Sequence, residues 1–280
     1  YVVVSNYLPH NVVILDAHTL EPLQEIVAMS ADGESSRVSA VYSAPPRNGL
    51  VVALKDVPEA WALTEAPAGE EGPIQVERIK LPGYLDDFMF DQDYKLILGA
   101  SRGGVGGQVI EISSGKKIAD LPLEGMPHLG SGITWDWNNS RVFATPHLRA
   151  NQISIIDMNT WKTVKAIKTD GPGFFMRSHE NSPYVWADVF FGPHRDKLYV
   201  IDKKSLEIVE TLNPAEGKTN AHVEFTRDGR FALVSVLEQD GALVVYDAKT
   251  LKEVKRLPMR RPVGKYNVYN KTRFSEGTSH

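Results

Sequence analysis

Short apolar runs alternate with polar turns along the chain, and one arrangement of them recurs. Apolar residues, an Asp, a short polar turn and a return strand appear as VVILDAHTLEPLQEI at Asp16, SIIDMNTWKTVKAI at Asp157, LYVIDKKSLEIVETL at Asp202 and LVVYDAKTLKEVKRL at Asp247. The last three Asp residues are 45 positions apart. A fixed period of this size, built from strands, is typical of propeller blades. The pattern therefore predicts an all-β fold, a β-propeller.

Each repeat divides into about four short strands separated by turns. The clearest copy covers residues 221–259, and similar units are expected at 173–213 and 131–168. Weaker units are expected at 85–123 and near 38–79, where a pair of prolines and a polar loop interrupt the pattern.

Both ends of the chain resemble partial units. The opening YVVVSNYLPHNVVILD matches FALVSVLEQDGALVVYD, so the first unit is expected to lack its innermost strand. The segment VGKYNVYN (263–270) begins a seventh unit. Since propellers commonly close by completing one blade from both termini, this count indicates the larger part of a seven- or eight-blade ring. The alternative is a six-blade ring, which requires the two partial ends to pair.

Composition narrows the chemistry. At 280 residues the chain can bury a sizeable core, and one domain is expected over 1–280. A formal charge of −4, with both signs interspersed, does not indicate a nucleic-acid partner. No apolar stretch approaches the roughly 18 residues that span a membrane. The absence of Cys excludes disulfides, thiolate catalysis and a c-type haem attachment within these residues.

Five segments carry a more specific signal: YVVVSNYLPHNVVILDAHTLEPLQEI, SRVSAVYSAPP, MPHLGSG, FMRSHENSPYVWAD and VGKYNVYNK. Together they resemble the haem d1 domain of cytochrome cd1 nitrite reductases and their biosynthetic relatives. ALKDVPEAW, NAHVEFT and the ending NKTRFSEGTSH are most similar to the dihydro-haem d1 dehydrogenase branch. The resemblance implies an eight-bladed propeller in the intact protein, of which this chain holds about six blades. The chain is then the C-terminal part of a longer protein, truncated at its N-terminus.

The resemblance also implies a function. The intact protein would be a periplasmic oxidoreductase that binds haem d1 or dihydro-haem d1 and oxidises a propionate of the precursor to an acrylate. Electrons would pass to a c-type haem on an upstream domain or to another acceptor, and cytochrome cd1 nitrite reductase is a candidate partner. The family's proximal iron ligand lies upstream of Tyr1, so no metal ligand is assigned here. The isolated chain is expected to be inactive.

Three alternatives stay open. A non-catalytic haem d1-precursor binding protein has similar motifs but no cytochrome domain, so a CxxCH motif upstream would separate it from the dehydrogenase. The d1 domain of a nitrite reductase is disfavoured, because Asp86 aligns with a second distal His of those enzymes. A propeller used as a protein-interaction platform is the alternative outside the family.

The predicted catalytic residues are His128, His222 and Tyr266, which lie where units begin. Loops that lead into innermost strands line the mouth of a propeller channel, where ligands usually bind. A His there can bind iron or move a proton near neutral pH. The resemblance assigns His128 and Tyr266 to the active site, and His222 is a His in the dehydrogenase branch but not in the nitrite reductases. The alternative for His128 is a solvated residue on the rim.

Arg37 and Arg177 are candidate clamps for the carboxylates of the macrocycle, because Arg binds a carboxylate in a bidentate fork. Either could instead be an ordinary ion-pair partner. His128 and His179 are further candidates for binding the cofactor. Asp86 and Asp87 are expected in a turn before the next strand.

Overall fold

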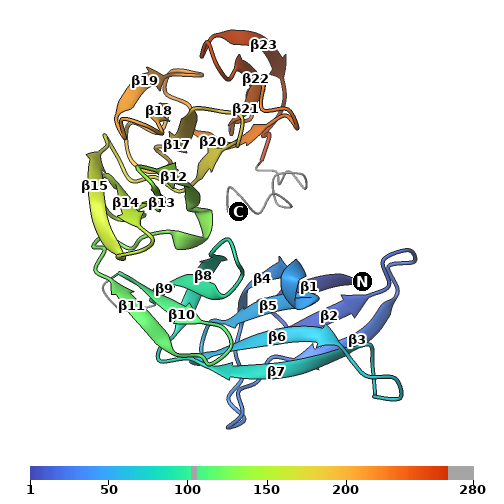
Figure 1. The fold of residues 1–280 in the computed structure, drawn as a ribbon. Coiled ribbons are helices and arrows are strands. Elements are labelled where there is room, and N and C mark those ends of the chain that lie inside the picture. The colour runs from blue at the N-terminus through green and yellow to red at the C-terminus, as the bar shows by residue number, and fades with distance from the viewer. Residues whose placement is uncertain (102–105, 264–280) are drawn as a thin grey trace. The chain divides into compact units, whose positions relative to one another are not determined.

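A computed structural model describes residues 1–101 and 106–263 of the chain (Figure 1). Strands make up nearly all of its regular structure, together with two short 3-10 helices, η1 (Pro45–Arg47) and η2 (Leu129–Ser131). The chain divides into two compact units, a first unit of Tyr1–Asp120 and a second unit of Leu121–His280. Each is described by itself.

The first unit holds one three-stranded and two four-stranded antiparallel sheets, with strand orders β1-β2-β3, β4-β5-β6-β7 and β8-β9-β10-β11. The strands are β1 (Val2–Asn6), β2 (Asn11–Leu15), β3 (Pro22–Val27), β4 (Val38–Ala44), β5 (Gly49–Leu54), β6 (Glu59–Glu65), β7 (Ile74–Lys80), β8 (Leu85–Phe90), β9 (Leu96–Ser101), β10 (Gly107–Glu111) and β11 (Lys117–Leu121). The first sheet thus has one strand fewer than the others, as predicted.

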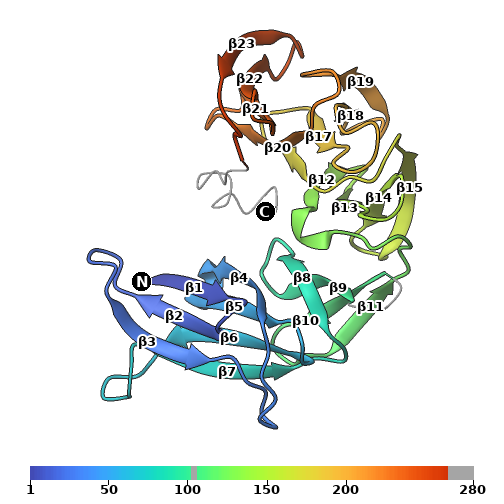
Figure 2. The same cartoon turned by 180° about the vertical axis from the view of Figure 1, so that it is seen from behind.

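The second unit holds three four-stranded sheets, seen from behind in Figure 2. Their strands are β12 (Ile133–Trp137), β13 (Ser140–Pro146), β14 (Gln152–Asp157), β15 (Lys162–Lys168), β16 (Met176–Ser178), β17 (Tyr184–Asp188), β18 (Leu198–Asp202), β19 (Ile208–Leu212), β20 (Asn220–Phe225), β21 (Phe231–Val236), β22 (Ala242–Asp247) and β23 (Glu253–Pro258). These bounds follow the predicted units at 131–168, 173–213 and 221–259.

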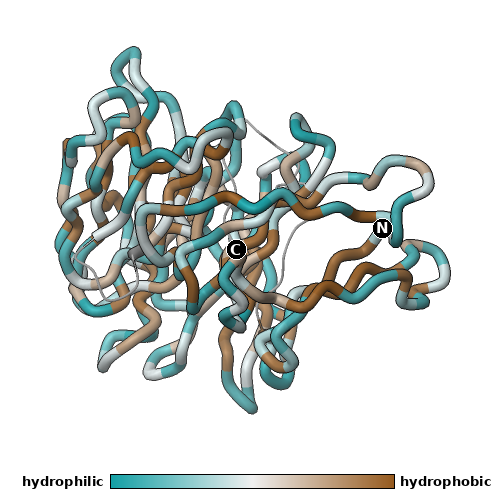
Figure 3. The backbone as a smooth tube through the Cα atoms, turned by 90° about the horizontal axis from the view of Figure 1, so that it is seen from below, coloured by the Kyte–Doolittle hydropathy of each residue, from teal (hydrophilic) through white to brown (hydrophobic). Residues whose placement is uncertain are grey.

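Every sheet is an up-and-down meander in which strands pair in sequence order. The last strand of each sheet is its most exposed one. All of β23 is exposed, for example, whereas all of β16, the first strand of another sheet, is buried. Apolar runs lie along the strands and polar residues gather at the turns (Figure 3). A repeated four-stranded meander is the architecture of a propeller blade.

Neighbouring sheets of a unit bury apolar side chains against each other. In the second unit, Trp186 and Val200 of one sheet pack with Phe225, Val234 and Tyr246 of the next. Burying one large apolar side chain stabilises a fold by about 1.5–3 kcal/mol. These contacts hold the first strands of adjacent sheets, β16 and β20, beside each other.

The repeated Asp shapes the same turn in four hairpins. In each, Asp Oδ1 accepts the backbone N–H groups two and three positions later. The residue four positions after the Asp has a left-handed φ of 56–61° and donates its N–H to the Asp carbonyl. These four residues are Leu20, Trp161, Leu206 and Leu251. The turns therefore belong to the scaffold.

Candidate functional site

His128 lies just before η2, in the loop that leads into β12, as predicted. Its backbone N–H donates to the Pro146 carbonyl at 2.9 Å, which ties the loop to the end of β13. Its Nδ1 lies 2.7 Å from the Phe174 carbonyl oxygen and 2.8 Å from Ser131 Oγ. Because a carbonyl can only accept, Nδ1 carries a proton, and the lone pair of the neutral ring is on Nε2. The half-buried imidazole therefore has a defined tautomer.

His222 occupies a β-bulge in β20. The pairing of this strand steps from Ala221 opposite Ser235 to Glu224 opposite Leu233, so β20 holds one extra residue. His222 has a φ of 52°, a left-handed conformation that costs a residue with a Cβ about 1–2 kcal/mol. Backbone strain of this kind occurs at functional sites, but the four Asp turns described above have the same left-handed φ. The role of His222 therefore stays a prediction.

Phe174 and Phe175, which precede β16, connect the two histidines. The His128 ring centroid lies 4.4 Å from that of Phe174 and 6.1 Å from that of Phe175. The His222 and Phe175 centroids are 3.8 Å apart, in an edge-on arrangement. Both imidazoles therefore contact the same aromatic side chain. Phe190 extends this aromatic group at 5.3 Å from Phe174.

Asp188, at the end of β17, holds the segment that carries these phenylalanines. One oxygen of the buried carboxyl, Oδ1, accepts the N–H groups of Phe174 at 2.8 Å and Phe175 at 3.1 Å. Burial raises the pKa of Asp188 to about 7, although the two N–H donors oppose the shift. Gly173 permits the close approach, since a Cβ there would lie 2.8 Å from the Asp188 carbonyl oxygen.

Arg177 lies in β16 with only 6% of its side chain exposed. Its Nε and Nη2 lie 3.1 and 3.0 Å from Oε2 of Glu224 in β20, whose side chain is equally buried. The Glu224 carboxylate thus balances the positive charge of Arg177 inside the fold. This favours a role in joining β16 to β20 over the predicted carboxylate clamp.

His179 is buried, and both of its ring nitrogens bind backbone groups. Nδ1 accepts the N–H of Asn181 at 3.0 Å, so Nε2 carries the proton and donates to the Arg227 carbonyl at 3.1 Å. These contacts favour a structural role for His179 over the predicted contact with the cofactor. His147 is likewise buried, with Nε2 2.9 Å from Ser154 Oγ.

The first unit carries a charged cluster around Tyr7. Arg37 forms a bidentate ion pair with Asp56 at 2.8 and 2.6 Å, and Lys55 pairs with Asp86. Both cations also lie over the Tyr7 ring, 5.4 and 5.6 Å from its centroid. Burial opposes the charge of Lys55, but its bonds to Asp86 and Tyr7 outweigh burial and raise its pKa. The predicted clamp Arg37 is therefore a member of an ion-paired network.

The expectation that Asp86 and Asp87 lie in a turn is wrong. Both are inside β8, at a bulge where Leu85 pairs with Ser101 and Phe88 with Gly99. The extra residue of this bulge interrupts the alternation of the strand, which hides the strand in the sequence. Tyr266 and the predicted seventh unit lie outside the described residues.

Residues 1–101 and 106–263 contain no cluster of three or more His, Asp or Glu side chains that could hold a metal ion. None of the helices in these ranges is long and apolar enough to cross a membrane.

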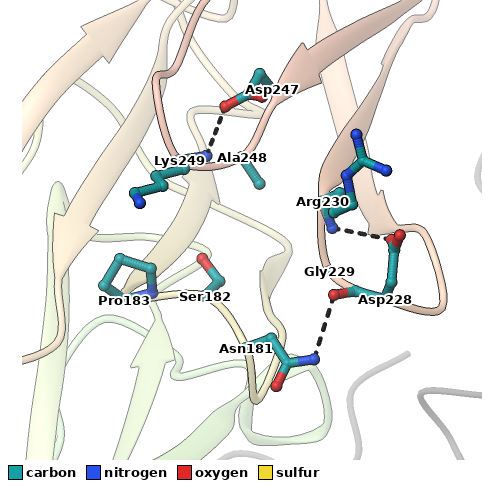
Figure 4. Close-up of a pocket in the computed structure, with 9 residues that line it drawn as sticks. All are labelled: Asn181, Ser182, Pro183, Asp228, Gly229, Arg230, Asp247, Ala248 and Lys249. Carbon is teal, nitrogen blue, oxygen red and sulfur yellow. Dashed lines mark hydrogen bonds between the residues drawn. The ribbon is translucent and has the colours of Figure 1, made fainter.

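A cavity of about 390 Å³ opens between three turns of the second unit (Figure 4). It is lined by residues of both charges, including Asp228, Arg230, Asp247 and Lys249. Asp228 accepts the backbone N–H of Arg230, and Asp247 that of Lys249, both at 3.1 Å. None of the predicted site residues lines this cavity.

The repeated four-stranded meanders define the chain as a domain of the β-propeller class. The family model for the cytochrome D1 heme domain matches residues 1–271. The chain belongs to this family, whose d1 domain is an eight-bladed propeller, and the predicted family and fold class are thereby confirmed.

Known relatives agree with this assignment. The chain is 56% identical to dihydro-heme d1 dehydrogenase of Pseudomonas aeruginosa, over 100% of its own length and 56% of the relative. A solved structure described as dihydro-heme d1 dehydrogenase NirN in complex with DHE has 56% identity and a TM-score of 0.91, covering 96% of this chain and 57% of that one. Protein NirF of P. aeruginosa is 29% identical over 94% of the chain and 68% of the relative. The chain thus spans little more than half of its dehydrogenase relative.

Phe174, Phe175 and Asp188 are not among the site residues predicted from the sequence. A signal was present in the paired phenylalanines before MRSH and in the Asp that ends YVWAD. Only the backbone geometry shows that the Asp binds the phenylalanine amides.

Proposed function

We propose that the complete protein is a dihydro-haem d1 dehydrogenase that oxidises a propionate side chain of its tetrapyrrole substrate to an acrylate. The observation that carries the proposal is that His128 and His222 contact the same side chain, Phe175, in a domain 56% identical to a protein of that name. By the same likeness, the protein acts in the periplasm and passes electrons to a c-type haem or another acceptor.

The residues of the second unit fit a tetrapyrrole. Half-buried phenylalanine rings offer apolar surface for a flat macrocycle, and the two imidazoles offer a base or an iron ligand. When bound, the macrocycle and its iron supply the redox chemistry, and the protein supplies binding, orientation and proton transfer. His128 and His222 would face the group, together with Tyr266.

His222 would act as the general base. Turning a propionate into an acrylate breaks two C–H bonds, forms a C=C bond and releases two protons and two electrons. His222 would take a proton, and His128 and Tyr266 would assist, while the electrons leave to the acceptor. A base for such a step needs to lie within hydrogen-bond reach and to have a pKa near the working pH, which suits an imidazole.

Arg37 remains the stronger candidate for a carboxylate contact. Its ion pair with Asp56 is partly exposed, with 30% of the Arg side chain accessible, so a substrate carboxylate could compete for the guanidinium. Arg177 and His179 would support the site without contacting the substrate, Arg177 through its ion pair with Glu224 and His179 through its hydrogen bonds to the backbone. The iron ligand is proposed to come from upstream of Tyr1.

The second candidate is a haem d1-precursor binding protein without catalysis, favoured by the match to a heme domain, which by itself calls for binding only. Nitrite reduction is a weaker candidate, because Asp86 presents a carboxylate paired with Lys55 instead of a second imidazole.

The test is a His222→Ala variant of the full-length protein. It should still bind the tetrapyrrole, seen as a visible absorption change, but lose turnover by about 10²–10⁴-fold, the usual effect of removing a general base. The matched control is His194→Ala, which changes an exposed His and should turn over normally. Normal turnover by His222→Ala would sink the role of His222. Wild-type binding without oxidation would favour the precursor-binding candidate.

A further inference from the structure

Asp188 and His128 are joined through one peptide bond. The peptide that links Phe174 to Phe175 contains the carbonyl of Phe174 and the N–H of Phe175. The N–H donates to Asp188 Oδ1 at 3.1 Å, and the carbonyl accepts from His128 Nδ1 at 2.7 Å. A continuous hydrogen-bonded chain therefore runs from a buried carboxyl, across a peptide, to an imidazole.

We propose that Asp188 is a positioning residue for His128, acting through the Phe174–Phe175 peptide to fix the Nδ1–H tautomer and to direct Nε2 toward the substrate. The role in catalysis rests on the function proposed above. The effect on the tautomer of His128 does not.

The physical basis is the polarity of the peptide group. An acceptor bound to the N–H of a peptide polarises the electrons of that peptide toward its carbonyl oxygen, which then becomes a better acceptor. Linked hydrogen bonds therefore strengthen one another. A stronger carbonyl acceptor favours the tautomer whose proton is on Nδ1. Histidines whose second nitrogen does chemistry are commonly oriented in this way, by a carbonyl or a carboxylate.

Two further contacts make the arrangement rigid. Asp188 Oδ1 also accepts the N–H of Phe174 at 2.8 Å, so two consecutive amides are held by one oxygen. Ser131 Oγ donates to the Phe174 carbonyl at 2.6 Å, using the second lone pair of that oxygen. The peptide therefore has little freedom to rotate away from His128.

The first experiment needs no substrate. Full-length protein with ¹⁵N-labelled histidine is studied by NMR, and the His128 signals are identified by their loss in His128→Gln. The wild-type ring should be in the Nδ1–H tautomer. Asp188→Leu, which is close in size but has no acceptor, should give a mixture of tautomers. Asp188→Asn, which keeps an acceptor oxygen, should restore the wild-type tautomer.

Two matched variants separate this role from general support of the fold. Asp91 in the first unit also accepts two consecutive amides with one oxygen, from Lys95 and Leu96 at 2.8 and 2.7 Å. Asp91→Leu should therefore leave the His128 tautomer unchanged. Ser131→Ala should also leave it unchanged, because Asp188 still binds the Phe174–Phe175 peptide and polarises its carbonyl.

Turnover gives the second readout. Asp188→Leu should lower kcat by about 10- to 100-fold, the usual effect of losing a residue that orients a functional His. KM should change little, and Asp91→Leu should retain kcat. An Nε2–H tautomer in the wild type, or an unchanged tautomer in folded Asp188→Leu, would overturn the proposal. If the wild type oxidises no tetrapyrrole, the proposed function fails, and the NMR result still decides the role of Asp188.

Discussion

The two units each contain an Arg–carboxylate pair beside candidate site residues, and the pairs differ in burial. In the first unit, Arg37 and Asp56 are 30% and 28% exposed at their side chains. In the second, Arg177 and Glu224 are both 6% exposed. Exposed pairs contribute about 0–1 kcal/mol, whereas breaking one side of a buried pair costs about 3–5 kcal/mol. The partly exposed Arg37–Asp56 pair can therefore open for a ligand carboxylate, as proposed for Arg37, whereas the buried Arg177–Glu224 pair can make its unit rigid.

The largest expected effect comes from breaking the buried pair. Arg177→Met should lower the free energy of unfolding by about 3–5 kcal/mol, because Glu224 is left buried without its cation. Arg37→Met should cost about 0–1 kcal/mol. Urea denaturation of both variants measures the difference.

The double variant Arg177→Met with Glu224→Met provides the control. It should recover much of the loss, since apolar side chains can replace a buried ion pair. An Arg177→Met variant as stable as Arg37→Met would show that the two pairs do not differ.

A smaller effect should separate two bulges, at His222 in β20 and at Asp86 in β8. His222 has a left-handed φ, whereas Asp86 is not among the described residues with positive φ. His222→Gly should therefore be more stable than His222→Ala by about 1 kcal/mol. At Asp86 the Ala variant should be at least as stable as the Gly variant. Gly relieves no backbone strain at this position and adds flexibility to the unfolded chain. Thermal unfolding of the four variants checks this.

The smallest effect concerns turns that both units share. The N–H of Thr19 holds the pKa of Asp16 below its ordinary value of 3.8, and the N–H of Thr250 does the same for Asp247. The stability each charge contributes is present above pH 3.8 and is lost as the pH falls through the lower folded pKa.

At pH 7, the Asp16→Asn and Asp247→Asn variants should therefore be slightly less stable than the wild type, by similar amounts. In acid, the stability of each variant should become equal to that of the wild type. Tm measured across the acid range tests this. A deficit that persists at low pH would instead point to lost hydrogen bonds.

The sequence predicted the scaffold better than the site. Strand alternation and the repeated Asp are local signals, so the four-stranded units and the shorter first sheet could be read from them. The bulge at Asp86 could not, because one extra residue breaks the alternation that marks a strand.

For the site, the sequence placed His128 and His222 at the starts of units, and the structure brings both to Phe175. The sequence did not indicate that Arg177 is buried against Glu224. It also did not indicate that both ring nitrogens of His179 form hydrogen bonds with the backbone. Such pairings depend on which strands of adjacent sheets meet. The link from Asp188 to His128 is harder still, since it passes through a peptide group that every residue has.

Because of the bulge in β20, the face on which each side chain of this strand lies depends on the number of residues in the strand. Side chains of a strand alternate between two faces, so a change of one residue in length moves every side chain on one side of the change to the opposite face. Deleting Val223 would thus displace His222 from Phe175 or Glu224 from Arg177, although neither residue had been changed. For this strand we expect its length to be constrained more tightly than its composition.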